Sequence, residues 1–508
     1  EFQPVRRRLT KKSHPYGRTT IEYRPAEEVI KDVESYYEMT YHVQEDEQIL
    51  VMDFPHLETN KDWKNLTGRP ESYLTNQLRR KRVEITERTA TPAERKLIMS
   101  AKDKEIQEFL KERVVTTLTK DQVSKVNPQD VMKMRFVLTW KVDPEAEGGK
   151  RAKARLVVLG FQDPFLGKEE TLAPTMQKRT RTMLFQNAVQ RKWKMYKADV
   201  KAAFLQGNEF KDSEKRYALP PKELAKAPGM REGDVRPVCL EKSVYGLTRA
   251  PLDWYRRVGE LLGSLGGKRM ESDPCVWIFY DEEEPETEDH RRKVIGCIGA
   301  YVDDFLISGE EGLKCWDKVI GIFKESFRWT PWESGTFKQT GLTIKQDLET
   351  MEFELDQIEY LKTISEIELS SHRKAQKTHK INENERSALR GLWGALQWLA
   401  TQSRMDLGAE IGLLQSCVTT ATVGHLLKAN KILRRAAKHV EETTFRIQEI
   451  PEMVVALGWT DASLKNRRDE SSTGGYVIGL TGESILRGKV CSVTPISWRS
   501  HKLKRVAV

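Results

Sequence analysis

The sequence predicts an α+β fold spread over several domains. Its 508 residues are enough for about three or four domains, each with a buried core. Two stretches, 132–143 and 152–163, are rich in β-branched and apolar residues and flank a Gly-Gly pair, which predicts a β-hairpin with a basic second arm. Residues 386–404 and 425–440 repeat apolar side chains at helical spacing, so both predict amphipathic helices. Hairpins and helices together indicate the α+β class.

The N-terminal part of the chain is expected to differ from the rest. Residues 1–92 are polar, carry blocks of both charges and show no sustained period, which predicts a mostly extended or disordered lead-in. A helical pattern begins close to residue 93, with Thr89 or Thr91 as the N-terminal cap. Its apolar residues lie roughly on one face and are Leu97, Ile98, Ile106, Phe109 and Leu110.

Beyond the first hairpin, residues 180–193 predict a further amphipathic helix, and residues 194–207 predict a strand that leads into a helix or turn. The strongly acidic stretch 281–290 is expected to be a solvated loop. Near the C-terminus, three strands separated by polar turns are predicted between about residue 453 and the end.

The charge balance favours a polyanionic partner. Lys and Arg total 85 against 75 Asp and Glu, which gives a net charge of +10 and a sequence pI near 9.0. Basic clusters recur at 6–12, 78–82, 148–155 and 178–181. One such cluster is most often a solvated face, whereas four on one chain indicate nucleic acid more strongly. The basic residues within 425–440 are open to both interpretations: Lys428, Lys431, Arg434, Arg435 and Lys438.

Cysteine and histidine usage excludes several classes of site. The six cysteines lie far apart without a Cys-x-x-Cys pair, which predicts reduced thiols and an intracellular location, in a cytoplasmic particle, the nucleus or both. The nine histidines form no short ligand pairing with one another or with cysteine, so no zinc site is expected. No apolar run approaches about eighteen residues, and a membrane is not an expected partner.

The stretch "VIGCIGAYVDDFLIS", residues 294–308, joins two apolar segments at Asp303 and Asp304. Alone, this pattern is most typical of an ordinary hairpin with polar turn residues. Asp199, however, ends another predicted strand, and if that strand lies beside the hairpin, three carboxylates share one site. Crowded carboxylates require a cation, and oxygen ligands suit Mg²⁺, with Mn²⁺ as a substitute. Two such ions would support an in-line displacement at phosphorus, which is nucleotidyl transfer.

Six segments in one order carry a resemblance to a known family. They are "KARLVVLGF", "KADVKAAFLQG", "KSVYGLTRAPLDWYRRV", "YVDDFLIS", "RGLWGALQWLATQSRMD" and "GWTDASLKNRRDESSTGGYVIGL". From about residue 93 onward the chain resembles the reverse transcriptase of copia-type long-terminal-repeat retrotransposon Pol polyproteins. The resemblance implies a right-hand polymerase, with fingers and palm over 93–365 and thumb and connection helices over 366–450. A truncated ribonuclease H-like α/β domain is expected over 451–508.

The resemblance also implies roles for individual residues. Asp199, Asp303 and Asp304 correspond to the palm carboxylates, and Asp199 and Asp303 are the expected principal metal ligands. The dNTP-binding residues are expected to be Phe204, which would block a 2′-hydroxyl, together with Tyr245, Gly246, Lys153 and Arg155. Phe204 is open to the alternative of a core aromatic, and Lys153 and Arg155 to that of plain surface residues.

Two further segments are assigned by the resemblance. "TGLTI", 340–344, is similar to the primer-gripping hairpin, and Arg404-Met405-Asp406 stands where the family has Arg-Pro-Asp, which predicts a less rigid turn. Asp461 matches the first carboxylate of ribonuclease H. Because the sequence ends at Val508, where a covering helix with a further acidic ligand is expected, we predict a poorly covered, poorly ordered sheet and no cleavage of RNA in a hybrid.

The sequence as a whole predicts an RNA-directed DNA polymerase. It would extend a primer 3′-hydroxyl with dNTPs along an RNA or DNA template, and other segments of a Pol polyprotein are expected partners. The alternative is a decayed or repurposed element that binds nucleic acid without catalysis, which the intact carboxylates disfavour. An RNA-making replicase is disfavoured by Phe204, which stands in place of a small residue.

Overall fold

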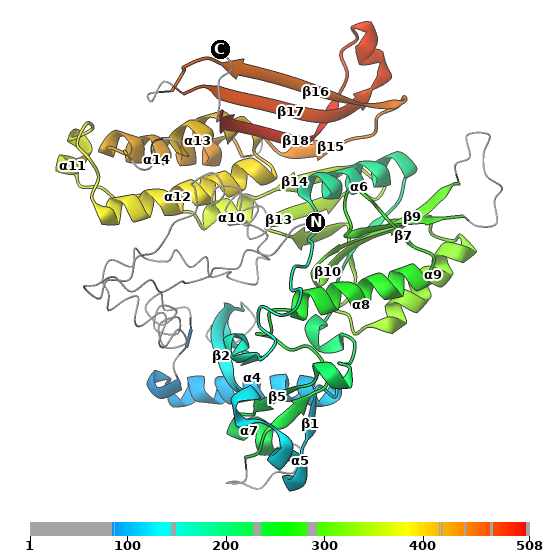
Figure 1. Cartoon of the computed structure of the whole chain (residues 1–508). Coiled ribbons are helices and arrows are strands. Elements are labelled where there is room, and N and C mark those ends of the chain that lie inside the picture. The colour runs from blue at the N-terminus through cyan, green and yellow to red at the C-terminus, as the bar shows by residue number, and fades with distance from the viewer. Residues whose placement is uncertain are drawn as a thin grey trace, which may run out of the picture. The chain divides into compact units, whose positions relative to one another are not determined.

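The computed structural model of the chain describes residues 84–85, 87–143, 149–226, 235–281, 292–415, 417, 420–440, 443–467 and 471–503. The predicted lead-in therefore lies almost entirely outside the described residues, as does the acidic stretch 282–290. Among the residues described, helices and strands are mixed in the way the α+β prediction requires (Figure 1).

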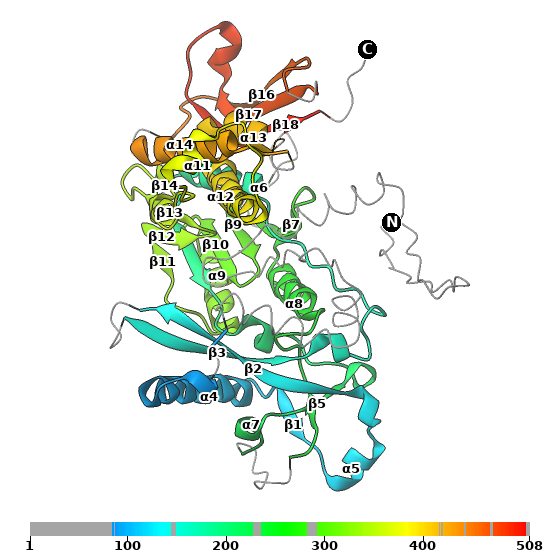
Figure 2. The ribbon, with the colours of Figure 1, turned by 90° about the vertical axis from the view of Figure 1, so that its left-hand side faces the viewer.

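The first sheet has the strand order β1-β6-β5-β2-β3. Its strands are β1 (Val115–Thr117), β2 (Val131–Val142), β3 (Lys150–Val158), β5 (Arg216–Leu219) and β6 (Val238–Leu240), and its short helices are α5 (Lys120–Lys125) and α7 (Lys222–Lys226). The long hairpin β2–β3 confirms the predicted one and packs on helix α4 (Pro92–Lys111), as Figure 2 shows.

Helix α4 begins where the sequence predicts, because the Thr91 side chain accepts the Glu94 amide and the Glu94 carboxylate accepts the Thr91 amide. Its buried face includes Ile98, Ile106 and Phe109 as predicted. Leu97 was expected on this face but is 40 % exposed, since it is adjacent to Ile98 and therefore about 100° away around the helix.

The central sheet has the order β11-β4-β10-β9-β8-β7. Its strands are β4 (Met195–Asp199), β7 (Lys268–Arg269), β8 (Val276–Tyr280), β9 (Val294–Tyr301), β10 (Asp304–Gly309) and β11 (Glu333–Ser334). Both faces are covered by apolar clusters, one with helix α6 (Lys178–Arg191), the other with α8 (Ala250–Ser264) and α9 (Lys314–Ser326). Burial on two faces explains why 294–308 is apolar almost throughout.

A third sheet, β12-β13-β14-β15, consists of β12 (Thr336–Gln339), β13 (Leu342–Gln346), β14 (Phe353–Asp356) and β15 (Phe445–Ile447). The segment "TGLTI" spans the β12–β13 turn, and Thr340 and Gly341 both have positive φ, as two-residue hairpin turns require. The buried Arg181 donates to Thr340 and Gln402, and so ties this hairpin to α6 and α12.

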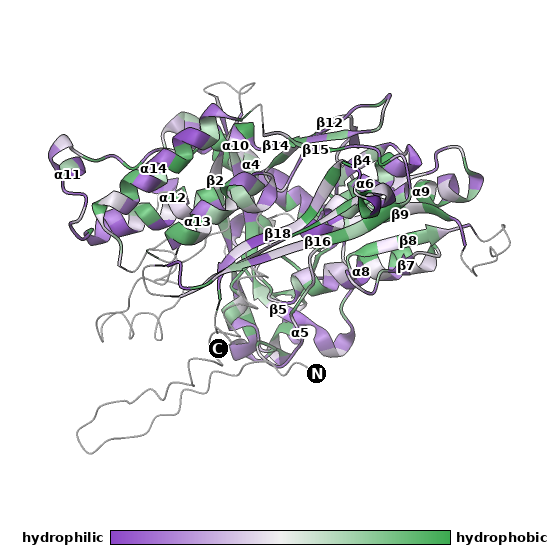
Figure 3. Cartoon of the chain, turned by 90° about the horizontal axis from the view of Figure 1, so that it is seen from above, coloured by the Kyte–Doolittle hydropathy of each residue, from purple (hydrophilic) through white to green (hydrophobic). Residues whose placement is uncertain are grey.

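Helices α10 (Ile358–Lys362), α11 (Ser371–Ala375), α12 (Glu383–Gln402), α13 (Gly408–Gln415) and α14 (Val423–Lys438) share a separate apolar cluster. The two helices predicted in this part of the sequence are confirmed as α12 and α14, and hydrophilic and hydrophobic bands alternate along both (Figure 3). Arg404 donates two hydrogen bonds of 2.9 Å to Asp406 and one to the Ala436 carbonyl. The turn predicted to be less rigid is therefore held by a buried arginine.

The last sheet has the order β16-β17-β18, with β16 (Val454–Ser463), β17 (Thr473–Gly482) and β18 (Val493–Lys502) as predicted. Strand β16 is largely exposed, whereas β18 packs against α6 and α13. Trp498 donates to the Ala400 carbonyl at 2.8 Å, and Thr494 donates to Gln186 at 2.6 Å. The expectation that no helix covers this sheet is therefore wrong for β18, because helices from earlier parts of the chain contact it.

Short 3-10 helices connect several of these elements: Glu87–Thr89, Pro128–Asp130, Gly160–Gln162, Ala203–Gln206, Asp212–Glu214, Met405–Leu407 and Glu483–Arg487. All six cysteines are free thiols. Within the described ranges, no helix combines the length and apolarity needed to span a membrane.

Candidate active site

The hairpin β9–β10 carries the two adjacent aspartates at its turn. Asp304 is the first residue of β10 and pairs with Tyr301 across the hairpin. Val302 adopts a φ of 57°, which is unfavourable for a β-branched residue, and its carbonyl accepts the Trp254 indole at 2.7 Å. The burial of both strands thus holds a strained turn in a fixed position, with its carboxylates at the end of the sheet.

Strand β4 brings the third carboxylate to the same place. β4 pairs antiparallel with β10, and Asp199 is the register partner of Asp304. The Val200 amide donates to the Asp303 carbonyl at 3.0 Å, which continues the contact one residue beyond β4. Directly opposed residues of an antiparallel pair point to the same face, so Asp199 and Asp304 share one face of the sheet. The predicted adjacency of the strand and the hairpin is therefore present.

Lys197 lies among these carboxylates and was not among the residues predicted from the sequence. Its ammonium lies 3.1 Å from Asp304 Oδ1 and 3.7 Å from Asp199 Oδ2. A third carboxylate, Glu333 on β11, lies 3.6 Å from the same ammonium. The Lys197 side chain is only 11 % exposed, and Asp199 follows it by two residues on the same strand face. Because side chains alternate between the two faces of a strand, the position of Lys197 two residues before Asp199 could have predicted that both lie on one face.

Burial and charge shift the titration of this group. Burial raises the pKa of Asp304 to about 7, Lys197 opposes the shift, and the carboxylates of Asp303 and Asp199 add to it. Burial alone would lower the pKa of Lys197, but Asp304 and Asp199 outweigh it, and that pKa is raised. Asp304 therefore binds a proton more readily than an ordinary aspartate, and the ammonium beside it favours its charged form.

The donor set suits a hard divalent cation. In the part of the chain that the structure describes, no three Asp, Glu, His or Cys side chains are placed together to hold a metal ion. Asp199 and Asp304 nevertheless both contact one cation, the Lys197 ammonium. Carboxylate oxygens are preferred ligands of Mg²⁺, so the chemistry of these two side chains fits such an ion.

Four of the five predicted dNTP-binding residues lie together. The rings of Phe204 and Tyr245 have centroids 5.4 Å apart, and the Arg155 guanidinium lies 5.3 Å from the centroid of the Tyr245 ring. Phe204 belongs to the 3-10 helix that follows β4 and is half-buried rather than fully enclosed. Lys153 lies two residues before Arg155 on the same face of β3.

Gly246 explains how Tyr245 is positioned. Gly246 has a φ of +97°, and a Cβ built on it would lie 2.1 Å from the Val158 carbonyl oxygen. A Cβ on Gly160 would in turn lie 2.0 Å from the Gly246 carbonyl oxygen. The Val158 amide donates to the Tyr245 carbonyl at 2.9 Å. The loop therefore contacts the end of β3 backbone to backbone, and only glycine permits this approach.

A buried ionic network lies next to the same loop and was also not predicted from the sequence. Arg249 donates to Asp253 at 2.8 Å and to Glu169 at 2.9 Å. Glu169 also accepts from Arg216, which is fully buried and donates to Asp163. Asp253 follows Arg249 by four residues, but the other carboxylates of the network come from distant parts of the chain, so the local sequence pattern does not mark the network as a whole.

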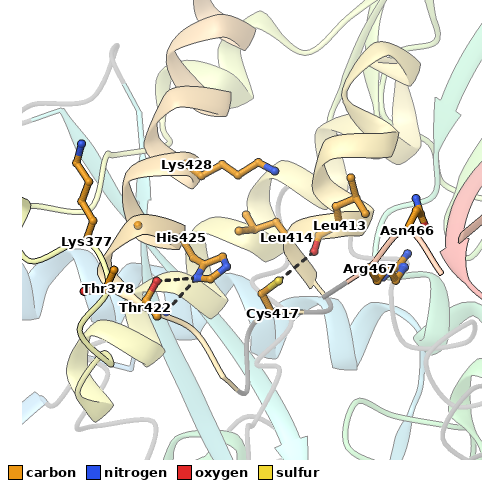
Figure 4. A pocket seen from close by; sticks show the side chains of 11 residues that line it. Lys377, Thr378, Leu413, Leu414, Cys417, Thr422, His425, Lys428, Asn466 and Arg467 are labelled. Atoms are coloured by element: carbon orange, nitrogen blue, oxygen red, sulfur yellow. Dashed lines mark hydrogen bonds between the residues drawn. The ribbon is translucent and has the colours of Figure 1, made fainter. Parts of the chain in front are cut away.

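The basic helix α14 has mixed surroundings. Arg434 pairs with Glu366 at 2.6 Å and Arg435 with Glu410 at 2.9 Å, so two of the basic residues for which both interpretations were open are ion-paired. Lys428 instead lines a pocket of about 580 Å³ between α13, α14 and the segment after β16 (Figure 4). Other basic residues of this pocket are Lys377, His425 and Arg467. Asp199, Asp303 and Asp304 do not line it.

Asp461 lies apart from every other predicted site residue. It is exposed on β16, pairs with Gly475 and accepts the Ala462 amide at 2.8 Å. No further carboxylate is placed with it to form a metal-binding group among the described residues.

Comparisons with known proteins identify the family. The sequence matches the family described as reverse transcriptase (RNA-dependent DNA polymerase) over residues 119–378, about half of the chain. The retrovirus-related Pol polyproteins from transposons RE1 and RE2 of Arabidopsis thaliana are each 26 % identical to the chain over 388 and 386 residues. That from transposon TNT 1-94 of Nicotiana tabacum is 26 % identical over 399 residues.

These alignments cover 73 to 74 % of this chain and 24 to 27 % of the relatives, so the chain spans about a quarter of their length. A solved structure of the foamy viral protease-reverse transcriptase dRH in complex with ds DNA aligns with a TM-score of 0.46 and 15 % identity, over 80 % of this chain and 56 % of that one. The resemblance to copia-type Pol polyproteins is thus confirmed, and the chain belongs to the reverse transcriptase (RNA-dependent DNA polymerase) family.

Proposed function

We propose that this chain is the RNA-directed DNA polymerase segment of a copia-type retrotransposon Pol polyprotein, and that it extends a primer 3′-hydroxyl with dNTPs. The observation that carries the proposal is the register of β4 with β10, which sets Asp199 opposite Asp304 beside the Asp303 turn. The family match supports the reaction class, and the net charge of +10 supports a nucleic-acid template and primer.

The chain's own residues would position the reactants. Asp199, Asp303 and Asp304 would hold two Mg²⁺ ions, which when bound supply activation of the attacking hydroxyl and neutralisation of the leaving oxygen. Arg155, with Lys153 beside it on β3, would bind the triphosphate. The Phe204 ring would exclude a 2′-hydroxyl, since Phe204 lies in the 3-10 helix that follows Asp199 at the end of β4.

The remaining parts of the chain would contact nucleic acid or the rest of the polyprotein. We propose fingers and palm over 93–365, thumb and connection over 366–450 and a ribonuclease H-like part over 451–508. The β12–β13 hairpin would contact the primer. Arg181 would hold the hairpin in place, because it ties the turn to helices α6 and α12. Reduced thiols favour an intracellular site of action, in a cytoplasmic particle or the nucleus.

Primer extension tests the proposal against its rival, a protein that binds nucleic acid without catalysis. The chain is incubated with poly(rA), oligo(dT), dTTP and Mg²⁺, and the length of the primer is followed on a denaturing gel. Mg²⁺-dependent extension is expected. Binding of the poly(rA)–oligo(dT) duplex without any extension, in Mg²⁺ or Mn²⁺, would establish the rival instead.

A further inference from the structure

Lys197 is enclosed by carboxylates from three strands. Asp199 lies on its own strand, Asp304 on the neighbour β10 and Glu333 on the other neighbour β11, where it is the register partner of Lys197. Three carboxylates thus face one ammonium at 3.1 to 3.7 Å. A lysine at the centre of the carboxylates proposed to hold metal ions is an obstacle to those ions, because like charges repel strongly at such distances in a partly buried site.

The surroundings of the ammonium are asymmetric. The Asp304 side chain is 9 % exposed and that of Asp199 is 35 % exposed, whereas Glu333 is 46 % exposed. Lys197 therefore has one buried partner, Asp304, and two partners that reach solvent, of which Glu333 is the more exposed. Its flexible four-carbon stem permits the ammonium to exchange between them without moving the backbone of β4.

We propose that Lys197 is a resident counter-ion of the metal site, which neutralises Asp199 and Asp304 while no metal ion is bound and moves to Glu333 when a divalent cation enters. The inference rests on the proposed function, since it assigns the carboxylates to metal binding. Lys197 is then a positioning residue that sets how tightly the enzyme without substrate holds metal, and Glu333 is the carboxylate that receives it.

Metal binding to the chain without nucleic acid tests the role of Lys197. Mn²⁺ is titrated onto the wild-type chain and the free ion is measured by electron paramagnetic resonance. The site is identified as the binding that disappears in Asp304→Asn. Lys197→Gln is expected to bind Mn²⁺ about tenfold more tightly, because the competing charge is gone. Lys194→Gln removes the same charge three residues earlier and is expected to leave the affinity unchanged.

Glu333→Gln tests the second position of the ammonium. Without its receiving carboxylate, Lys197 is expected to remain between the aspartates, and Mn²⁺ binding should weaken several-fold. Equal or weaker binding in Lys197→Gln than in the wild type would overturn the proposal. If that variant does not fold, Lys197→Arg replaces it: a guanidinium binds the carboxylates through a fixed fork and should weaken Mn²⁺ binding, and unchanged affinity would overturn the proposal equally.

Failure of the counter-ion proposal can be distinguished from failure of the proposed function. A wild-type chain that extends primers, together with a Lys197→Gln variant whose Mn²⁺ affinity is unchanged, refutes only the counter-ion. A chain that never extends a primer, but whose Mn²⁺ affinity responds to Lys197 and Glu333 as described, refutes only the polymerase.

Discussion

The central sheet and the C-terminal sheet both present an aspartate that the sequence marks as a candidate ligand, yet they place it in opposite environments. Asp304 is buried, lies opposite a second aspartate and contacts a lysine at 3.1 Å. Asp461 is exposed on a largely exposed strand and accepts the amide of the adjacent Ala462. The difference shows that a matching motif becomes a site only where neighbouring strands bring other charged groups to the same face.

The largest effect should come from the same substitution made in each sheet. Asp303→Asn is expected to reduce Mg²⁺-dependent primer extension at least about 100-fold, since it removes a proposed metal ligand. Its affinity for the primer–template duplex should stay near that of the wild type. Asp461→Asn is the matched control and should extend normally. A folded Asp303→Asn chain with nearly full activity would remove Asp303 from the metal site.

The same comparison predicts a difference in stability. Phe305 on β10 is fully buried and contacts the rings of Phe323 and Trp329, so Phe305→Ala should lower the free energy of unfolding by about 3 to 5 kcal/mol. Trp459 on β16 is 43 % exposed, and Trp459→Thr should change it by less than about 0.5 kcal/mol. Urea denaturation followed by circular dichroism measures both, and similar losses would mean that another surface covers β16.

Phe204→Val sharpens the account of the central site. Removal of the ring opens space next to the proposed position of C2′, so the ratio of ribonucleotide to deoxyribonucleotide incorporation should rise by roughly 10- to 100-fold. Competing rUTP and dTTP in single-nucleotide extension measure this ratio. Phe305→Leu serves as a control for loss of an aromatic elsewhere in the sheet. An unchanged ratio with retained dTTP use would show that Phe204 is a core residue.

The smallest expected effect concerns Glu105, a partly buried residue whose pKa is raised although it is not among the proposed catalytic residues. Burial raises the pKa of Glu105 on α4 to about 7, although it accepts the Leu156 amide at 3.0 Å. The folded chain therefore binds a proton that the unfolded chain releases, and stability falls as pH rises from about 4.5 to 7. Glu105→Gln should raise the free energy of unfolding at pH 8 by about 1 to 3 kcal/mol and leave extension intact. Urea melts at pH 5 and pH 8 test this, and an unchanged pH dependence would contradict it.

The features that the sequence predicted are those set by neighbouring residues, and those it did not predict depend on residues that lie far apart in the chain. The strand ending at Asp199 follows from local alternation, the hairpin at Asp303 follows from two apolar segments joined at polar residues, and the family resemblance connects them. The alternation of β4 places Lys197 on the face of Asp199, but its partner Glu333 lies on a two-residue strand with no periodicity of its own, so the group was not predicted. The network of Arg216 and Arg249 was not predicted because, apart from Asp253, its carboxylates come from distant parts of the chain. Coverage of β18 by helices from earlier in the chain likewise depends on tertiary packing.

The contact between Gly160 and Gly246 has a consequence for motion. Because the backbone of the Tyr245 loop lies directly against the end of β3, the loop and the strand should move together, with Arg155. The segment of Phe204 is tied to the same loop as well: besides the contact between the rings of Phe204 and Tyr245, the Phe210 amide donates to the Glu241 carbonyl at 2.7 Å. A change in the spacing of the two rings must therefore either bend the short segment between Phe204 and Phe210 or break a backbone hydrogen bond.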